Sequence, residues 1–533
     1  MTRKTTKTNG LSRRSFIGSG ATLGAMAGLG GLPFASSAIA DSMVEGSILT
    51  ARVYADISSL DPAFWTSAVD AMVIRCLFAH SLMYDTNSDV FEAQPSAMKS
   101  YEFIDDTHIA FELHEGIMYS GDYGEMTAED AKYSFERIAN PELNSPYMED
   151  WATLDHVEVT GKYTGVIVLT QPFAPLLTTT LPGVSGVILP KAAIEDAGGR
   201  FSVQPPCFSG PYRIKDWQPK TRLILERNPD WTLTDAPYEE LHLIPIEDPK
   251  TAELGFEAGD LDFSEISVSS IPRYEANLPA GAEFNKFEGL NYYWMGINEL
   301  NDQLADKNVR RAIQLAVDRK TVVDASSLGG AVPAAGIIAP ALIGSREANL
   351  YDRDVEESKR LLEEAGMANS LNLTISIQQT AENLAAAQVI QANLAEVGIQ
   401  VTINQYESGT FWSLGSKDEG DQYLDLQLFL MRFSMQPDPS WATMWFTPQQ
   451  IGIWNWQGFD NAEFGELQEA AQIEIDTEKR DGMYKRMQDL MEESGDFVFL
   501  NFVPVGVLNS DKVQTALRPD GEPVFYEFSP KQG

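Results

Sequence analysis

One stretch of the sequence, residues 425–456, concentrates residue types that bind small solutes. An apolar run leads into Arg432, and Met435 and Asp438 follow it closely. Four tryptophans complete the stretch: Trp441, Trp445, Trp454 and Trp456. Binding sites for small molecules combine a large aromatic surface with a few polar groups that fix orientation. We therefore predict a ligand site with these contacts from the stretch: Arg432, Met435, Asp438, Trp441, Trp454 and Trp456.

Arg432 has the most specific chemistry of these residues. A guanidinium group that faces a cleft binds a carboxylate through two parallel hydrogen bonds. Arg432 could equally form an ion pair with Asp425 or Asp438 inside the protein. The sequence leaves both interpretations open.

Three further aromatic residues are candidate ligand contacts. Trp65 follows a turn at residues 60–63, which itself follows an expected strand at residues 48–57. Tyr292 and Trp294 belong to an expected strand at residues 288–298. Because side chains alternate along a strand, Tyr292 and Trp294 share one face and Tyr293 points to the other.

The sequence shows no pattern typical of catalysis or metal binding. Its five histidines and two cysteines are not spaced as metal ligands. No G-x-S-x-G elbow, H-E-x-x-H helix or phosphate-binding loop is present. Carboxylates are so numerous that a close pair would arise by chance. We therefore predict no catalytic residue, no metal ion and no cofactor.

The clearest local element is a β-hairpin at residues 207–231. Gly210-Pro211 predicts a chain reversal, and residues 218–220 predict the hairpin loop. Asn228-Pro229 predicts the end of the second strand, because proline cannot donate a hydrogen bond to the ladder. A helix is expected further upstream, with Thr127 as its N-cap.

The second half of the chain alternates between strands and helices. Residues 371–377, 385–397 and 399–403 predict a parallel strand–helix–strand unit. One amphipathic helix is expected at residues 307–323, and one long helical stretch at residues 460–493. We expect Arg310, Arg311 and Arg319 to form salt bridges on the surface of the first of these helices, each worth about 0.5 kcal/mol.

Several of these segments, taken together, resemble one protein family. The motifs are SGPYRIKDW with LERNPDW in the hairpin, the segment 94–135, and DKNVRRAIQLAVDR at residues 306–319. Their order and spacing are similar to those of the extracytoplasmic solute-binding proteins of family 5. That family comprises the peptide, dipeptide, nickel and opine receptors of ABC importers.

The resemblance implies an α/β fold of the periplasmic-binding-protein type II, with two lobes. It implies an extra subdomain in the first lobe and a hinge made of two chain crossings, at residues 288–298 and 496–507. The implied division is a lobe I core at residues 41–80, 207–287 and 496–533, an accessory subdomain at 81–206 and lobe II at 288–495. Two or three subdomains also suit 533 residues, which are too many for one core.

The resemblance also bears on the ligand. In family members that bind free peptides, an aromatic residue and an acid precede an Asp-Pro pair, and the acid meets the amino terminus of the peptide. Aligned on Asp438-Pro439, those two positions hold Arg432 and Met435. The anchor for an ammonium group is therefore missing at this position. Acidic or modified peptides, opine-like conjugates and oligosaccharides all remain compatible with an aromatic cleft.

The beginning of the sequence predicts export. Residues 12–17 form a twin-arginine pattern, a weakly apolar run follows, and residues 38–40 form an A-x-A cleavage site. We expect a signal peptide at residues 1–40, a periplasmic protein, and no lipid anchor because no cysteine follows the apolar run. Cys76 and Cys207 would then either form a disulfide or remain as two free, buried thiols.

We expect a monomeric substrate-binding protein that delivers a small peptide-like or amino-acid-derived solute to an ABC permease in the inner membrane. The formal net charge of −38 argues against a nucleic-acid partner, since an acidic surface repels phosphates. Two alternatives remain. One is a secreted hydrolase that uses carboxylates in the cleft, and the other is a ligand sensor or chaperone with the same cleft.

Overall fold

The structure, a computed structural model, describes residues 47–531. The expected signal peptide at residues 1–40 lies outside the described residues. The expected mature N-terminus at Asp41 lies outside them as well.

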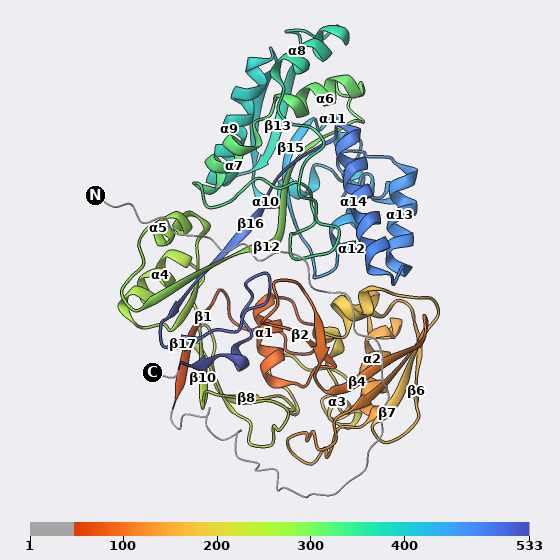
Figure 1. The fold of residues 1–533 in the computed structure, drawn as a ribbon, viewed down its shortest axis with the longest axis vertical. Coiled ribbons are helices and arrows are strands. Elements are labelled where there is room, and N and C mark those ends of the chain that lie inside the picture. Colours follow the sequence, from red (N-terminus) through yellow and green to blue (C-terminus); the bar gives the residue numbers. More distant parts are fainter. Residues whose placement is uncertain (1–46, 532–533) are drawn as a thin grey trace, which may run out of the picture. The chain divides into compact units, whose positions relative to one another are not determined.

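The largest sheet of the described residues is mixed and has ten strands. Figure 1 shows its arrangement. Its strand order is β14-β13-β15-β12-β16-β11-β1-β10-β9-β8. The bounds are β1 Ile48–Val53, β8 Tyr212–Gln218, β9 Arg222–Arg227, β10 Glu240–Pro245, β11 Phe263–Ile266, β12 Ala282–Ile297, β13 Asn372–Gln378, β14 Gln400–Tyr406, β15 Leu428–Ser434 and β16 Phe497–Ser510.

Two long antiparallel strands, β12 and β16, join the two lobes within this sheet. Strand β12 also pairs with β15 of the second lobe, and β16 pairs with β11 of the first. The chain therefore crosses between the lobes twice, which confirms the predicted two-lobed fold with its two crossings.

In the first lobe, the predicted hairpin at residues 207–231 is confirmed as β8 and β9. The glycine before it is required by packing. Ser209 N and Gly210 N both donate to Leu77 O, at 3.1 and 2.9 Å. A Cβ atom on Gly210 would lie 2.5 Å from Phe78 N, so only glycine fits against the end of helix α1, Ala68–Leu77.

A second sheet, of four antiparallel strands in the order β4-β5-β7-β6, covers its own apolar core. Helix α2, Ala128–Ala139, packs on it and begins at the predicted N-cap Thr127, whose N donates to Asp130 Oδ2 at 2.8 Å. The bounds of the elements in this segment are β2 Leu82–Tyr84, β3 Ala93–Pro95, β4 Met98–Asp105, β5 His108–Leu113, β6 Leu154–Val159, β7 Thr164–Leu169 and α3 Lys191–Asp196.

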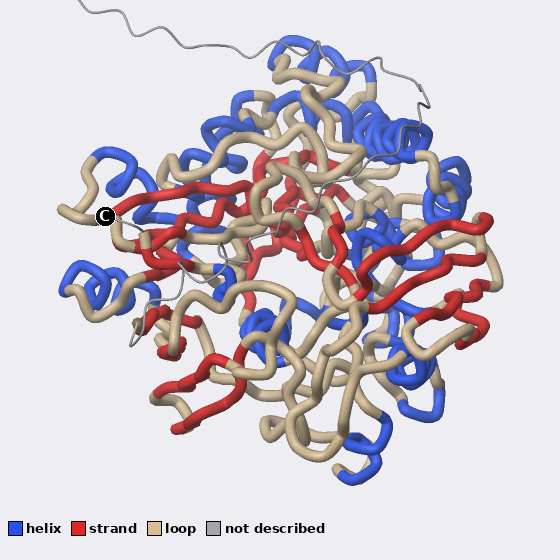
Figure 2. The backbone as a smooth tube through the Cα atoms, turned by 60° about the horizontal axis from the view of Figure 1, so that its bottom comes forward, coloured by secondary structure: helices blue, strands red, loops and turns tan. Residues whose placement is uncertain are grey.

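In the second lobe, β13 and β14 pair in parallel and are connected by α9, Ala381–Glu396. This confirms the predicted strand–helix–strand unit. Helix α8, Val355–Glu364, begins at Asp354, whose side chain accepts from Glu357 N. The remaining elements are α4 Pro249–Ala258, α5 Ile271–Ala276, α10 Ser408–Ser413, α11 Gln422–Asp425, α12 Ser440–Thr443, β17 Val513–Gln514 and β18 Ser529–Pro530. Long loops connect many of these elements, and they are drawn in tan in Figure 2.

Two helix predictions were wrong in the same way. The single helix expected at residues 307–323 is two helices, α6 Lys307–Ala316 and α7 Arg319–Ser327. The stretch at residues 460–493 is α13 Ala462–Ile473 and α14 Thr477–Ser494. In each case an aspartate, Asp318 or Asp476, accepts hydrogen bonds from the first turn of the second helix. The chain therefore restarts a helix at a strong N-cap residue.

Arg310 and Arg319 form salt bridges as expected, but the expected place of these salt bridges on the helix surface was wrong. Arg310 is buried and pairs with Asp496 and Glu299. Arg319 is largely buried and pairs with Glu492 at 3.4 Å. These side chains face inward because α6 and α7 pack against the end of α14 and the start of β16. The two cysteines, Cys76 and Cys207, are free and buried, so the disulfide alternative is not realised.

Candidate ligand-binding cleft

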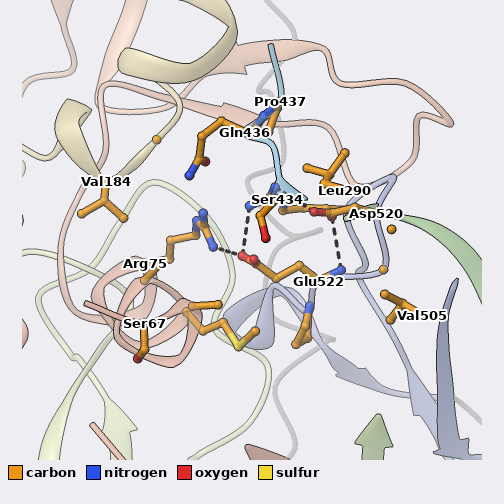
Figure 3. A pocket seen from close by; sticks show the side chains of 18 of the residues that line it. Ser67, Arg75, Val184, Leu290, Ser434, Gln436, Pro437, Val505, Asp520 and Glu522 are labelled. Atoms are coloured by element: carbon orange, nitrogen blue, oxygen red, sulfur yellow. Dashed lines mark hydrogen bonds and ion pairs between the residues drawn. The ribbon is translucent and has the colours of Figure 1, made fainter. Parts of the chain in front are cut away.

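A cavity of about 610 Å³ is lined by segments of both lobes (Figure 3). We call it the first cavity. The first lobe contributes the loop after β1, helix α1 and the loop at residues 518–523. The second lobe contributes Leu290 and Asn291 of β12 and residues 434–437 at the end of β15. In Figure 3, Gln436 and Arg75 reach into this space from opposite sides.

An aromatic pair forms one wall of the first cavity. The rings of Trp65 and Tyr147 stack with centroids 4.7 Å apart and planes inclined by 5°. Tyr147 Oη also donates to Trp65 O at 2.8 Å, which fixes the pair. Trp441 lines the cavity from the second lobe. A flat aromatic wall of this kind offers stacking area at little cost in side-chain entropy.

An ionic network forms another part of the lining of the first cavity. Glu522 pairs with Arg75 and with Arg518, and Arg518 also reaches Asp520 at 3.1 Å. Burial would raise the pKa of Glu522, but Arg518 and Arg75 hold it below its usual value. Figure 3 shows the contact between Arg75 and Glu522 as a dashed line. The charges of this network therefore largely neutralise one another.

A second cavity, of about 920 Å³, meets the first at Arg52, Tyr54 and Glu265. Arg432 lines it, together with Tyr293 and Trp412. Tyr293 Oη donates to Asn383 Oδ1 at 2.7 Å. Among residues 47–531, no acidic side chain forms an ion pair with Arg432, whereas Asp438 pairs with Arg480 at 2.8 Å. The interpretation in which Arg432 forms an ion pair with Asp438 is therefore excluded.

The residues predicted as ligand contacts fall into three groups. Trp65, Met435 and Trp441 line the first cavity, and Arg432 lines the second. Asp438 is fully buried and lines neither cavity.

The other four predicted ligand contacts also lie outside both cavities. Tyr292, Trp294 and Trp456 lie in an apolar core, because one face of β12 is covered by residues around Phe446. Trp454 is partly exposed and lies 6.2 Å from Trp412, measured between ring centroids.

The sequence analysis did not predict several residues that line the first cavity. They are Arg75, Tyr147, Asp150, Ser434, Gln436, Arg518, Asp520 and Glu522. For Ser434 and Gln436 the signal was available, since they flank the predicted contact Met435. The others come from segments far apart in the chain, and no local pattern marks them.

Comparison with known families gives a decisive match. The sequence model described as "Bacterial extracellular solute-binding proteins, family 5 Middle" matches residues 92–452. The chain belongs to the extracellular solute-binding proteins of family 5. The resemblance noted from the sequence motifs is thereby confirmed.

Relatives of this family 5 protein are named as binding proteins. It is 27% identical over 397 residues to the periplasmic oligopeptide-binding protein OppA of Salmonella typhimurium, which covers 67% of this chain and 70% of the relative. It is 24% identical over 478 residues to the probable D,D-dipeptide-binding periplasmic protein DdpA of Escherichia coli, covering 87% and 90%. The structure of HbpA2 from Haemophilus parasuis superimposes with a TM-score of 0.80 at 22% identity, covering 91% and 100%.

Two further findings concern the described part of the family 5 protein. Between residues 47 and 531, no helix combines the length and the apolar character that a membrane span requires. Within the same residues, no three histidine, cysteine, aspartate or glutamate side chains are grouped as metal ligands.

Proposed function

We propose that this protein captures a peptide-like or amino-acid-derived solute between its lobes and delivers it to an ABC permease in the inner membrane. The observation that carries the proposal is the first cavity, whose walls come from both lobes of a family 5 fold. A solute held there contacts both lobes at once, so binding favours the closed arrangement. No bond of the solute is broken in this function.

Closure needs a place where the crossing strands bend. The pairing of β12 with β16 shifts register between Glu288 and Tyr292, opposite Pro504 and Phe502. Gly289 lies in this interval, and proline in β16 provides no hydrogen-bond donor. We propose that the lobes rotate about this irregular segment.

The solute class follows from the polar groups of the two cavities. Arg432 has no acidic partner among the described residues, so we propose that it binds a carboxylate of the solute. The other proposed contacts are Trp65, Met435 and Trp441 in the first cavity. The names of OppA and DdpA, which refer to oligopeptides and D,D-dipeptides, support a peptide-like solute.

We also propose a route of export and a division into domains. The twin-arginine signal of residues 1–40 would direct the folded chain to the periplasm, where it acts as a monomer without a lipid anchor. The lobe I core would comprise residues 41–80, 207–287 and 496–533, with an accessory subdomain at 81–206 and lobe II at 288–495. The apolar cores support this division in part. Most of the core of the four-stranded sheet comes from residues 81–206, whereas Val184, Leu189 and Phe201 pack in the lobe I core. Phe497–Phe502 pack in the cores of lobe II.

A thermal-shift screen of the chain from Asp41 onward tests the function. The panel contains peptides, opines, oligosaccharides, amino-acid conjugates and metal ions. A solute present at about 100 times its Kd stabilises the native state by about 2.7 kcal/mol. We expect a carboxylate-containing hit that is recovered chemically unchanged. Conversion of a hit to product would favour the secreted hydrolase. If the protein loaded with the hit binds a signalling protein in place of a permease, this would favour the sensor.

The role of Arg432 is tested with the hit from that screen. Arg432→Ala should lower the affinity at least about 10-fold, because a charge-assisted hydrogen bond contributes about 1.5–3 kcal/mol. Arg360→Ala is the matched control, since Arg360 is an exposed guanidinium on α8 that lines neither cavity. Unchanged affinity in Arg432→Ala would remove Arg432 from the site.

A further inference from the structure

The charges that line the first cavity do not balance within the protein. Three arginines and four carboxylates line it: Arg52, Arg75, Arg518, Asp150, Glu265, Asp520 and Glu522. Arg75 and Arg518 are engaged with Glu522 and Asp520, and Arg52 acts on Glu265. Asp150 is the carboxylate left without a basic neighbour.

The surroundings of Asp150 fix its side chain but do not neutralise it. It lies in the short 3₁₀ helix η2, Met148–Trp151, and accepts a hydrogen bond from Ser185 Oγ at 2.5 Å. The pKa of its carboxyl group is raised to about 6: burial and, to a smaller extent, Glu149 raise it, while the hydrogen bond from Ser185 opposes them. No positive charge contributes. At pH 7 the cavity wall therefore carries an unpaired carboxylate, which is costly unless a partner arrives.

The aromatic wall adds a second feature next to this carboxylate. Tyr147 lies one helical turn before Asp150 and stacks on Trp65. Trp65 Nε1 is buried and has no hydrogen-bond partner among residues 47–531. A carboxylate beside aromatic rings is the environment that binds an ammonium group, through an ion pair and cation–π attraction.

We propose that Asp150 binds a protonated amino group of the solute. This inference rests on the proposed function and specifies its substrate class, which is a solute with a free amino end. Met435, at the position where peptide-binding relatives would be expected to place an acid, has no charge. The segment 81–206 would thus supply the ammonium anchor from a different part of the fold. Together with Arg432 in the second cavity, Asp150 would select zwitterionic solutes.

Native mass spectrometry with two tripeptide libraries tests the proposal. One library has free amino termini, and the other is the same library after N-acetylation. We expect the wild-type chain to bind members of the first library and to bind their acetylated forms about 10- to 100-fold more weakly, as for the loss of one charge-assisted hydrogen bond. Asp150→Asn should bind the free library with the same 10- to 100-fold loss and should no longer distinguish the two libraries.

Glu265→Gln is the matched control, because Glu265 also lines the first cavity but lies beside Arg52. It should preserve the preference for free amino termini. Equal binding of both libraries by the wild type, or an unchanged preference in Asp150→Asn, would overturn the proposal and leave the proposed function intact. Loss of the preference in Glu265→Gln alone would assign the amino group to Glu265 instead. Failure of the wild type to bind either library would overturn the proposed function for peptides, and this inference with it.

A pH profile separates an ionic role of Asp150 from a structural one. Affinity of the wild type for the free library should fall as the pH is lowered from 7 to 5, since protonation removes the charge of Asp150. Asp150→Asn should show a flat profile over this range. Other ionisable groups face the same site or its neighbours: Glu149, Tyr147, Glu265, Asp520, Glu522, Arg52, Arg75 and Arg518. A profile that persists in Asp150→Asn would assign the titration to one of these groups.

Discussion

The ion pair between Asp438 and Arg480 makes a sharp prediction about stability. Both side chains are almost completely buried, and Arg480 Nη2 donates to Asp438 Oδ1 at 2.8 Å. Asp438 also accepts from Ser440 N at 2.9 Å and from Thr178 Oγ1 at 2.6 Å. Every described polar contact of this carboxylate is therefore inside the protein, which argues for a structural role.

Asp438→Ala would leave the guanidinium of Arg480 buried with two weaker neutral acceptors, Ala471 O and Tyr484 Oη. Removing one partner of a buried pair costs about 3–5 kcal/mol. For a chain of this length, 1 kcal/mol corresponds to a change in Tm of about 1 °C. We therefore expect Tm to fall by about 3–5 °C, measured by scanning calorimetry at pH 7.

A double variant that removes both charges refines this prediction. Arg480→Met alone should cost a similar amount, while Asp438→Leu with Arg480→Met should recover most of the loss, because no unpaired charge remains. The pair also has a defined pH dependence. Arg480 and the hydrogen bonds lower the pKa of Asp438 against the effect of burial, so its stabilisation is present above pH 3.8 and is lost as the pH falls further. An Asp438→Ala variant with unchanged Tm would refute the reasoning.

Three further predictions follow from the same structure. Asp150→Asn should raise the Tm of the ligand-free protein by about 1–2 °C at pH 8 and leave it unchanged near pH 4. The pKa of Asp150 is raised to about 6 in the folded state, so the wild type loses stability as the pH rises from 4 to 6. A lower Tm of the variant at pH 8 would contradict this. Gly210→Ala should cost about 1–3 kcal/mol in urea denaturation because its Cβ would press on Phe78 N, whereas Gly482→Ala, where a Cβ meets nothing, should be neutral or slightly stabilising. Cys76 and Cys207 should not react with a thiol reagent until urea unfolds the chain. Both thiols are buried, and burial raises the pKa of each to about 12. Rapid reaction in the native state would show that one of them is accessible.

The sequence predicted most of the fold where local and tertiary preferences agree. The hairpin β8–β9 and the unit β13–α9–β14 were expected within a few residues of their observed bounds, and helix α2 begins at its predicted N-cap Thr127. The two helix breaks were missed because the apolar pattern continues through them. Asp318 and Asp476 are typical N-cap residues, so the missed signal was present in the sequence.

The candidate site was less predictable, for two physical reasons. Strand alternation told which residues of β12 share a face, but not which face another layer of the protein would cover. Tyr292 and Trp294 proved to be on the covered face. In addition, Tyr147 and Asp150 reach the first cavity only because a distant segment folds back on the loop after β1. No periodicity or motif encodes such a contact.

The contact of Gly210 with the end of α1 has an evolutionary consequence. Leu77 O accepts from both Ser209 N and Gly210 N, so residues 78–208 begin and end at neighbouring points of the chain. Exchange of this segment by recombination would keep the strand order of the large sheet, provided that the new segment also supplies the apolar contacts that Val184, Leu189 and Phe201 make with the first-lobe core. Because Tyr147 and Asp150 belong to this segment, the exchange would replace one wall of the first cavity while conserving the crossing strands. Under the proposed function, such an exchange would change the solute while the two crossing strands stayed the same.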